Sequence, residues 1–127
     1  MTQQEKQLLL KDLCARLPYG VKIKVRSNDI RIVRAVDVVE GIVYFVESDS
    51  ISPFGVHIEH PTTFRQVVKP YLRPMSYMTE EEKNVYINTF ITMWDAVDWL
   101  NEHHFDYREL IEKGLAIEAK EGMYKTK

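Results

Sequence analysis

The apolar pattern of the chain changes at a proline-containing segment, residues 70–78, which reads Pro-Tyr-Leu-Arg-Pro-Met-Ser-Tyr-Met. Before this segment, apolar residues mostly alternate with polar ones or form short β-branched runs, which is typical of strands. After it, apolar residues recur at helical spacing. A chain in which strands are followed by helices is predicted to be an α+β protein.

One domain with one hydrophobic core suits a chain of 127 residues, since a chain of this size buries roughly two thirds of the surface that it exposes when unfolded. Thr2 and Glu5 have the spacing of a capping box at the start of a helix. Within a single domain, 1–127, we predict four segments: a helix over 1–17, a β-region over 20–69, a helical region over 79–114 and a loose tail over 120–127. Docking of Met123 and Tyr124 is the alternative for the tail.

The β-region begins with a strict alternation over residues 21–26. It puts three cations on the wet face of a half-buried strand, namely Lys22, Lys24 and Arg26. Residues 30–39 and 42–46 complete an antiparallel meander. Residues 56–59 are predicted as a fourth strand, and 62–68 as either a capped turn or a fifth strand. The expected fold is therefore α+β, with an N-terminal helix, a small antiparallel sheet of four or five strands or a Src-homology-3-like barrel, and then two or three C-terminal helices.

The helical region begins at a second capping box, formed by Thr79 and Glu82. Apolar residues then recur at helical spacing, but a β-branched run in the middle favours a break. Residues 79–103 are therefore predicted as either one helix or two. A third capping pair, Asp106 with Glu109, predicts a further short helix.

The histidines form two clusters, and neither has the spacing of a catalytic or metal site. They are His57, His60, His103 and His104. A zinc site needs three or four well-placed ligands, whereas the histidines of each cluster project in different directions. No serine or cysteine lies in a nucleophile context near His104 and Asp106. We predict no catalytic, metal-binding or cofactor-binding residue, leave the role of the histidines open and favour a protein that is not an enzyme.

Cysteine usage and hydropathy indicate the compartment. The single cysteine, Cys14, excludes an intramolecular disulfide and fits a reducing environment. No stretch approaches the roughly 20 apolar residues of a membrane span, and the first residues lack the order of a signal peptide. We expect a cytoplasmic protein without a membrane partner.

The formal net charge of −2 hides a segregation of charge along the chain. Six cations between residues 16 and 34 face a single acidic residue, whereas acidic residues dominate from 80 to 112. Such a layout can steer a charged partner, and a tryptophan can anchor an interface. The predicted interaction surface consists of Lys22, Lys24, Arg26, Arg31, Arg34, Trp94 and Trp99.

Several strings of the sequence carry a resemblance to a known group of proteins. They are VKPYLRPM (68–75), MTEEEK (78–83), LCARLPYGV (13–21), DWLNEHHFDYRELIEKGLA (98–116) and EGMYK (121–125). In these strings the chain resembles a family of small uncharacterised proteins from gut Bacteroides genomes, prophages and related phages. The resemblance implies a mobile-element or phage origin and brings no activity, cofactor or binding residue with it.

We expect a non-enzymatic binding or adaptor protein that acts through its β-region or the exposed side of its C-terminal helices, with a protein as its partner. The alternative is a nucleic-acid-associated accessory protein that uses the basic strand face, although no recognition module is present. A small hydrolase or metal-dependent enzyme is the third reading. Homodimerisation stays open, because edge strands and exposed aromatic residues can pair.

Overall fold

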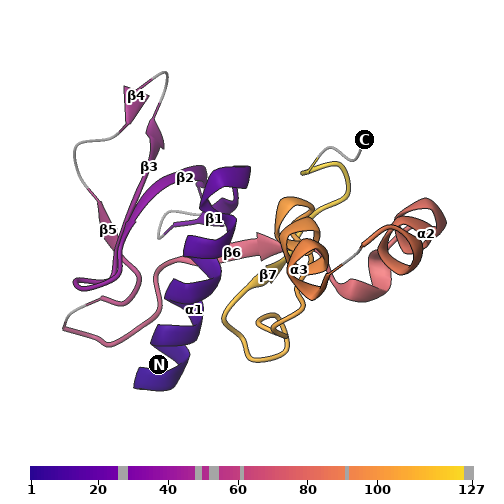
Figure 1. Ribbon diagram of the computed structural model, residues 1–127. Coiled ribbons are helices and arrows are strands. Elements are labelled where there is room, and N and C mark those ends of the chain that lie inside the picture. Colours follow the sequence, from indigo (N-terminus) through magenta and orange to yellow (C-terminus); the bar gives the residue numbers. More distant parts are fainter. Residues whose placement is uncertain (26–28, 48–49, 52–54, 61, 91, 125–127) are drawn as a thin grey trace.

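The computed structural model describes residues 1–127 except 26–28, 48–49, 52–54, 61, 91 and 125–127. It begins with helix α1 (Gln3–Arg16), which runs along one face of a sheet (Figure 1). The predicted capping box is confirmed: the Glu5 amide donates to Thr2 Oγ1 at 3.1 Å, and the Thr2 amide donates to Glu5 Oε1 at 2.9 Å. A short 3-10 turn (Leu17–Tyr19) follows, and Gly20, with a φ of 68°, ends it.

The described residues form one sheet of seven short strands. They are β1 (Lys22–Lys24), β2 (Ile30–Asp37), β3 (Ile42–Glu47), β4 (Ser50–Ile51), β5 (Val56–His57), β6 (Lys69–Leu72) and β7 (Ile117–Glu118). Six follow one another in the order β4-β3-β2-β1-β6-β7, while β5 pairs with β3. The α+β fold is confirmed, as is the antiparallel meander of β1, β2 and β3. Among the described residues no pairing joins the end strands β4 and β7, so the β-region takes the sheet form.

The sheet differs from the expected one at β6 and β7, which are parallel to each other and make it mixed. Residues 62–63 form a turn, and the strand that follows starts only at Lys69. Pro70 lies within β6 and pairs with Ile23 of β1. Proline cannot donate to a neighbouring strand, but it is tolerated near the start of one. The beginning of the proline-containing segment therefore belongs to the sheet rather than to a boundary.

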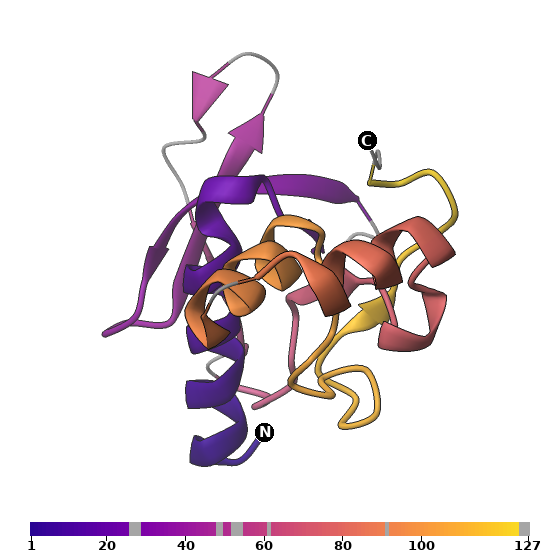
Figure 2. The ribbon, with the colours of Figure 1, turned by 45° about the vertical axis from the view of Figure 1, so that its right-hand side comes forward.

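Residues 79–103 form two helices, α2 (Glu80–Asn88) and α3 (Met93–Glu102). Each helix begins after a threonine whose hydroxyl accepts a hydrogen bond from a backbone amide of the first turn. Thr79 forms the predicted capping box with Glu82, and Thr92 Oγ1 accepts from the Asp95 amide at 3.2 Å. Figures 1 and 2 show α3 beside α1, with α2 on the outer side.

The further helix expected at Asp106 is wrong, because residues 106–114 form turns. The Asp106 carboxylate accepts hydrogen bonds from the amides of Leu110, at 2.8 Å, and Ile111, at 2.9 Å. A helix cap would instead accept an amide two or three residues ahead. Glu109 has a φ of 60°, which a right-handed helix excludes.

Two groups of buried apolar side chains form the core. The larger lies between α1 and the sheet and includes Leu9, Leu13, Ile23, Val33 and Leu110. The smaller consists of Met78, Leu100 and Phe105 and joins α3 to the segment before α2.

Residues 120–124 return to the sheet. The Tyr124 hydroxyl accepts a hydrogen bond from the Lys22 amide at 2.8 Å and donates to the Tyr71 carbonyl at 2.8 Å. The docking of Tyr124, which was the alternative to a loose tail, is therefore what the structure has. Residues 125–127 of the predicted tail lie outside the described part of the chain.

Candidate interaction surfaces

The histidines make separate contacts rather than one cluster. His57 is exposed on β5, and His60 lies in the loop that follows it. His103 and His104 are neighbours in the chain, yet they stack on different aromatic rings, with centroids 4.3 and 3.8 Å apart. Within the described ranges, no three or more His, Cys, Asp or Glu residues are placed to hold a metal ion.

His104 is buried and electrostatically unsuited to act as a base. Its side chain is 4% exposed, and its Nδ1 has no hydrogen-bond partner among the described residues. Burial, together with the positive charge of Arg16, lowers the pKa of His104 to about 3. Asp106 is engaged with backbone amides. The two side chains proposed for an acid–base pair therefore make structural contacts.

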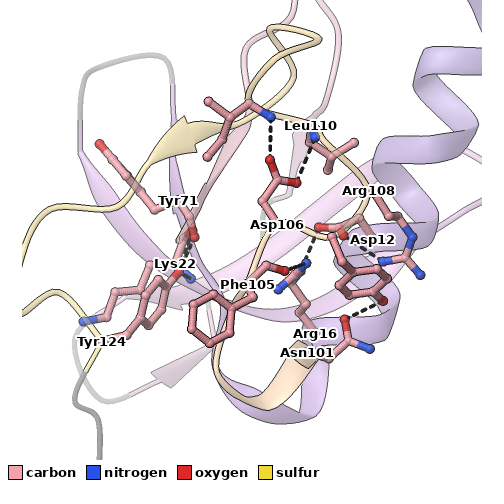
Figure 3. Close-up of polar contacts among 12 residues, drawn as sticks. Asp12, Arg16, Lys22, Tyr71, Asn101, Phe105, Asp106, Arg108, Leu110 and Tyr124 are labelled. Carbon is pink, nitrogen blue, oxygen red and sulfur yellow. Dashed lines mark hydrogen bonds and ion pairs between the residues drawn. The ribbon is translucent and has the colours of Figure 1, made fainter. Parts of the chain in front are cut away.

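A buried ionic network ties α1 to the segment after α3 (Figure 3). Asp12 and Arg16 are both fully buried, and Arg16 Nε lies 3.0 Å from Asp12 Oδ2. Arg108 Nη1 lies 2.8 Å from the other carboxylate oxygen, and Arg16 Nη2 donates to the Phe105 carbonyl. This network was not predicted from the sequence. The available signal was an acidic and a basic residue four positions apart beside the apolar residues of one helix.

The predicted cations of the β-region are divided between two sheet faces. Arg31 pairs with Ile23 across β1 and β2, so it lies on the same face as Ile23, whereas Lys22 and Lys24 lie on the other. Arg31 Nη2 is 3.3 Å from Asp29. Lys22 Nζ donates to the carbonyl of Met123 at 2.7 Å. Two of the expected binding cations are thus engaged within the protein.

The remaining cations differ in their surroundings. Arg34 is exposed on β2. Lys24 is half-buried and pairs with Lys69 across β1 and β6. Arg26 lies outside the described residues. The structure therefore places Lys24 opposite Lys69, a cation of another strand.

The two tryptophans of α3 have different environments. Trp99 belongs to an aromatic cluster, with ring centroids 5.9 Å from Tyr86 and 5.8 Å from both Phe90 and Phe105. Trp94 is 78% exposed. Only Trp94 is thus available as an interface anchor.

Two further apolar side chains flank the same connection between α2 and α3. Ile87, one residue before the end of α2, and Met93, the first residue of α3, are each 75% exposed. We call Ile87, Met93 and Trp94 the helix-connection patch. Isolated exposed apolar residues are ordinary, and large exposed apolar patches mark contact sites. Three such residues within eight positions, on both sides of one connection, make this region the candidate contact surface.

An acidic hollow of about 650 Å³ lies at the start of α2, lined by Glu80, Glu81, Val85 and Trp99 among others. Glu82 also lines it and accepts two hydrogen bonds from Arg73, at 2.8 and 2.9 Å. Burial raises the pKa of Glu82, but the hydrogen bonds from Arg73 and Thr79 outweigh it and lower the pKa overall. Glu80 and Glu81 are exposed.

No family model, curated protein or solved structure matches this chain. In the described part of the chain, no helix is long and apolar enough to cross a membrane.

Three residues at these surfaces were not predicted from the sequence. Ile87 and Met93 lie in a region of helical apolar spacing, which does not distinguish buried from exposed positions, and both are exposed. Lys69 is the third. Its position opposite Lys24 depends on the register between β1 and β6, for which the sequence held no signal.

Proposed function

We propose that this chain is a non-enzymatic adaptor of mobile-element or phage origin that binds a protein through the helix-connection patch. The observation that carries the proposal is the exposure of Trp94, 78%, beside Met93 and Ile87 at 75% each. Tryptophan buries a large area at low entropic cost and is enriched among the residues that dominate binding energy. An exposed tryptophan in the first turn of a helix is well placed for this use.

Charge around the patch supports a partner segment that is both apolar and basic. Asp95 and Asp98 are exposed on α3. Carboxylates at the rim of an apolar patch select a cationic partner and speed its association. The origin of the protein rests on the family resemblance of its sequence.

The proposal is tested by affinity purification from a lysate of gut Bacteroides cells, the source that the resemblance implies, after nuclease treatment. Wild-type protein is compared with Trp94→Ser and with Val39→Ser. Val39 is 86% exposed in the turn between β2 and β3 and serves as the matched control. Loss of a hot-spot aromatic costs about 2 kcal/mol or more, which is about thirty-fold in affinity.

The expected result is a stoichiometric protein that wild type and Val39→Ser retain and Trp94→Ser loses. Equal recovery by all three proteins would contradict the proposal. Light scattering on purified protein identifies a second copy as the partner if wild type is a dimer and Trp94→Ser is a monomer. Equal unfolding midpoints for the three proteins confirm that the variants remain folded.

A further inference from the structure

A second surface, independent of the helix-connection patch, lies where β1 and β6 meet the segment that carries His60, Thr63 and Arg65. It is a hollow of about 760 Å³, within the range of ligand-binding pockets. Its polar lining includes Lys24, Lys69, Arg65 and His60, and no described carboxylate lines it. We call it the basic groove. The overall charge of −2 gives no hint of this local excess of cations.

Two lysines face each other across the floor of the basic groove. Lys24 and Lys69 are direct cross-strand partners in antiparallel β1 and β6. Like charges at such positions are destabilising. No ion pair joins Lys24, Lys69 or Arg65 to an acidic residue in the described part of the chain. A bound anion would therefore remove a repulsion that the folded protein otherwise carries.

His60 adds a further donor to the basic groove. Its Nδ1 accepts hydrogen bonds from the amides of Thr62, at 3.2 Å, and Thr63, at 3.4 Å. The neutral imidazole must then carry its proton on Nε2, which is a donor. The side chains of His60, Lys24, Lys69 and Arg65 can thus all donate hydrogen bonds into the groove. Phosphate oxygens are acceptors and are recognised by such donors.

Phe64, between Thr63 and Arg65, which both line the basic groove, is exposed on a strained backbone. Its side chain is 68% exposed and its φ is 53°, in the left-handed region that favours glycine. Two backbone hydrogen bonds hold the loop: the Phe64 amide donates to the His60 carbonyl at 2.9 Å, and the His60 amide donates to the Arg65 carbonyl at 2.8 Å. Strain held at a fixed site is typical of functional positions. Because the Phe64 ring is exposed, packing in the hydrophobic core does not explain an aromatic residue at this position.

We propose that the basic groove binds single-stranded nucleic acid, with backbone phosphates on Lys24, Lys69 and Arg65 and a base stacked on Phe64. Non-specific single-strand binders combine a cationic groove with exposed aromatic rings in this way. A duplex hides the faces of its bases, so it gives Phe64 nothing to stack on. Because the donors address phosphates rather than base edges, binding is independent of sequence.

The salt dependence of binding measures the number of phosphate contacts. Fluorescence anisotropy with a labelled oligothymidylate of about 12 nucleotides is suitable, since single-strand sites span about 4–16 nucleotides. Three phosphate contacts predict a slope of log K against log salt of about −2, and hence about twenty-fold weaker binding at 200 mM than at 50 mM salt. The double variant Lys24→Gln/Lys69→Gln leaves one phosphate contact, so its slope should be shallower, about −0.7.

Two further variants separate stacking from charge. Phe64→Asn removes the ring while retaining a residue that tolerates the left-handed backbone, and it is expected to weaken binding about five- to 150-fold. Lys11→Gln/Lys83→Gln makes the same change in net charge on α1 and α2, away from the basic groove, and should bind as wild type does. Urea midpoints of all variants confirm that they remain folded.

The proposal is overturned if wild type does not bind in 50 mM salt, or if Lys24→Gln/Lys69→Gln binds as well as Lys11→Gln/Lys83→Gln. The assignment to single strands is overturned if Phe64→Asn retains full affinity or a duplex of equal length binds as tightly. Displacement by polyglutamate as readily as by unlabelled oligothymidylate would assign the groove to acidic polypeptides instead, and would also overturn it.

Discussion

Asparagine in place of Asp12 keeps the shape of the side chain and removes its charge. Asp12 is fully buried and contacts two guanidinium groups, those of Arg16 at 3.0 Å and Arg108 at 2.8 Å. Arg16 is itself fully buried, so water cannot replace the lost carboxylate. Removal of one partner from a buried ion pair costs about 3–5 kcal/mol. With an m value of about 2 kcal/mol/M, the urea midpoint of Asp12→Asn should fall by about 2 M.

Urea unfolding followed by tryptophan fluorescence and circular dichroism gives this shift. The control is Lys83→Gln, which removes the exposed ion pair between Lys83 and Glu80, 3.4 Å apart, and should cost less than about 1 kcal/mol. Asp12→Leu with Arg16→Met removes the two fully buried charges and leaves Arg108, whose side chain is 16% exposed and can reach water, so it should recover most of the stability. A loss for Asp12→Asn no larger than that of Lys83→Gln would refute the argument that Arg16 depends on this carboxylate.

Two further predictions concern acid stability and packing. Because burial lowers the pKa of His104 from 6.5 to about 3, its neutral form contributes stability above pH 6.5 that is lost as the pH falls towards 3, amounting to about 2 kcal/mol at pH 5. His104→Asn, which tolerates the φ of 60°, should lose that much less stability than wild type between pH 7.5 and 5 in urea titrations, and identical losses would contradict it. A Cβ on Gly55 would lie 2.2 Å from Ile42 Cγ2, so Gly55→Ala should lower the free energy of unfolding by about 1–3 kcal/mol; an unchanged urea midpoint would mean that the backbone there shifts without cost.

Local patterns predicted those parts of the fold that depend on sequence neighbours. The capping boxes at Thr2 and Thr79 start α1 and α2 where expected, because each depends on two residues three positions apart. The alternation over residues 21–26 predicted β1 for the same reason. Asp106 shows the limit of such patterns, since the same residue types satisfy amides in a turn as readily as at a helix start.

Long-range register accounts for what the sequence did not predict. The pairing of Lys24 with Lys69 and the separation of Arg31 from Lys24 follow from how three strands align, and no local pattern fixes that alignment. The sequence offered both Trp94 and Trp99 as interface anchors, and the packing of Trp99 on Phe105 leaves Trp94 as the exposed one. Whether these residues bind a partner stays a prediction.

The hydrogen bonds of Tyr124 to β1 and β6 form late, because Tyr124 is close to the end of the described chain. The Lys22 amide finds its hydrogen-bond partner 102 positions later in the chain, so β1 emerges from the ribosome long before it is complete. Contacts this distant in sequence slow folding, because chain entropy must be lost before they form. Until Tyr124 is made, that amide and the Tyr71 carbonyl stay open to other strands. The edge of β1 and β6 at these two groups is thus completed only when the last residues of the described chain have been made.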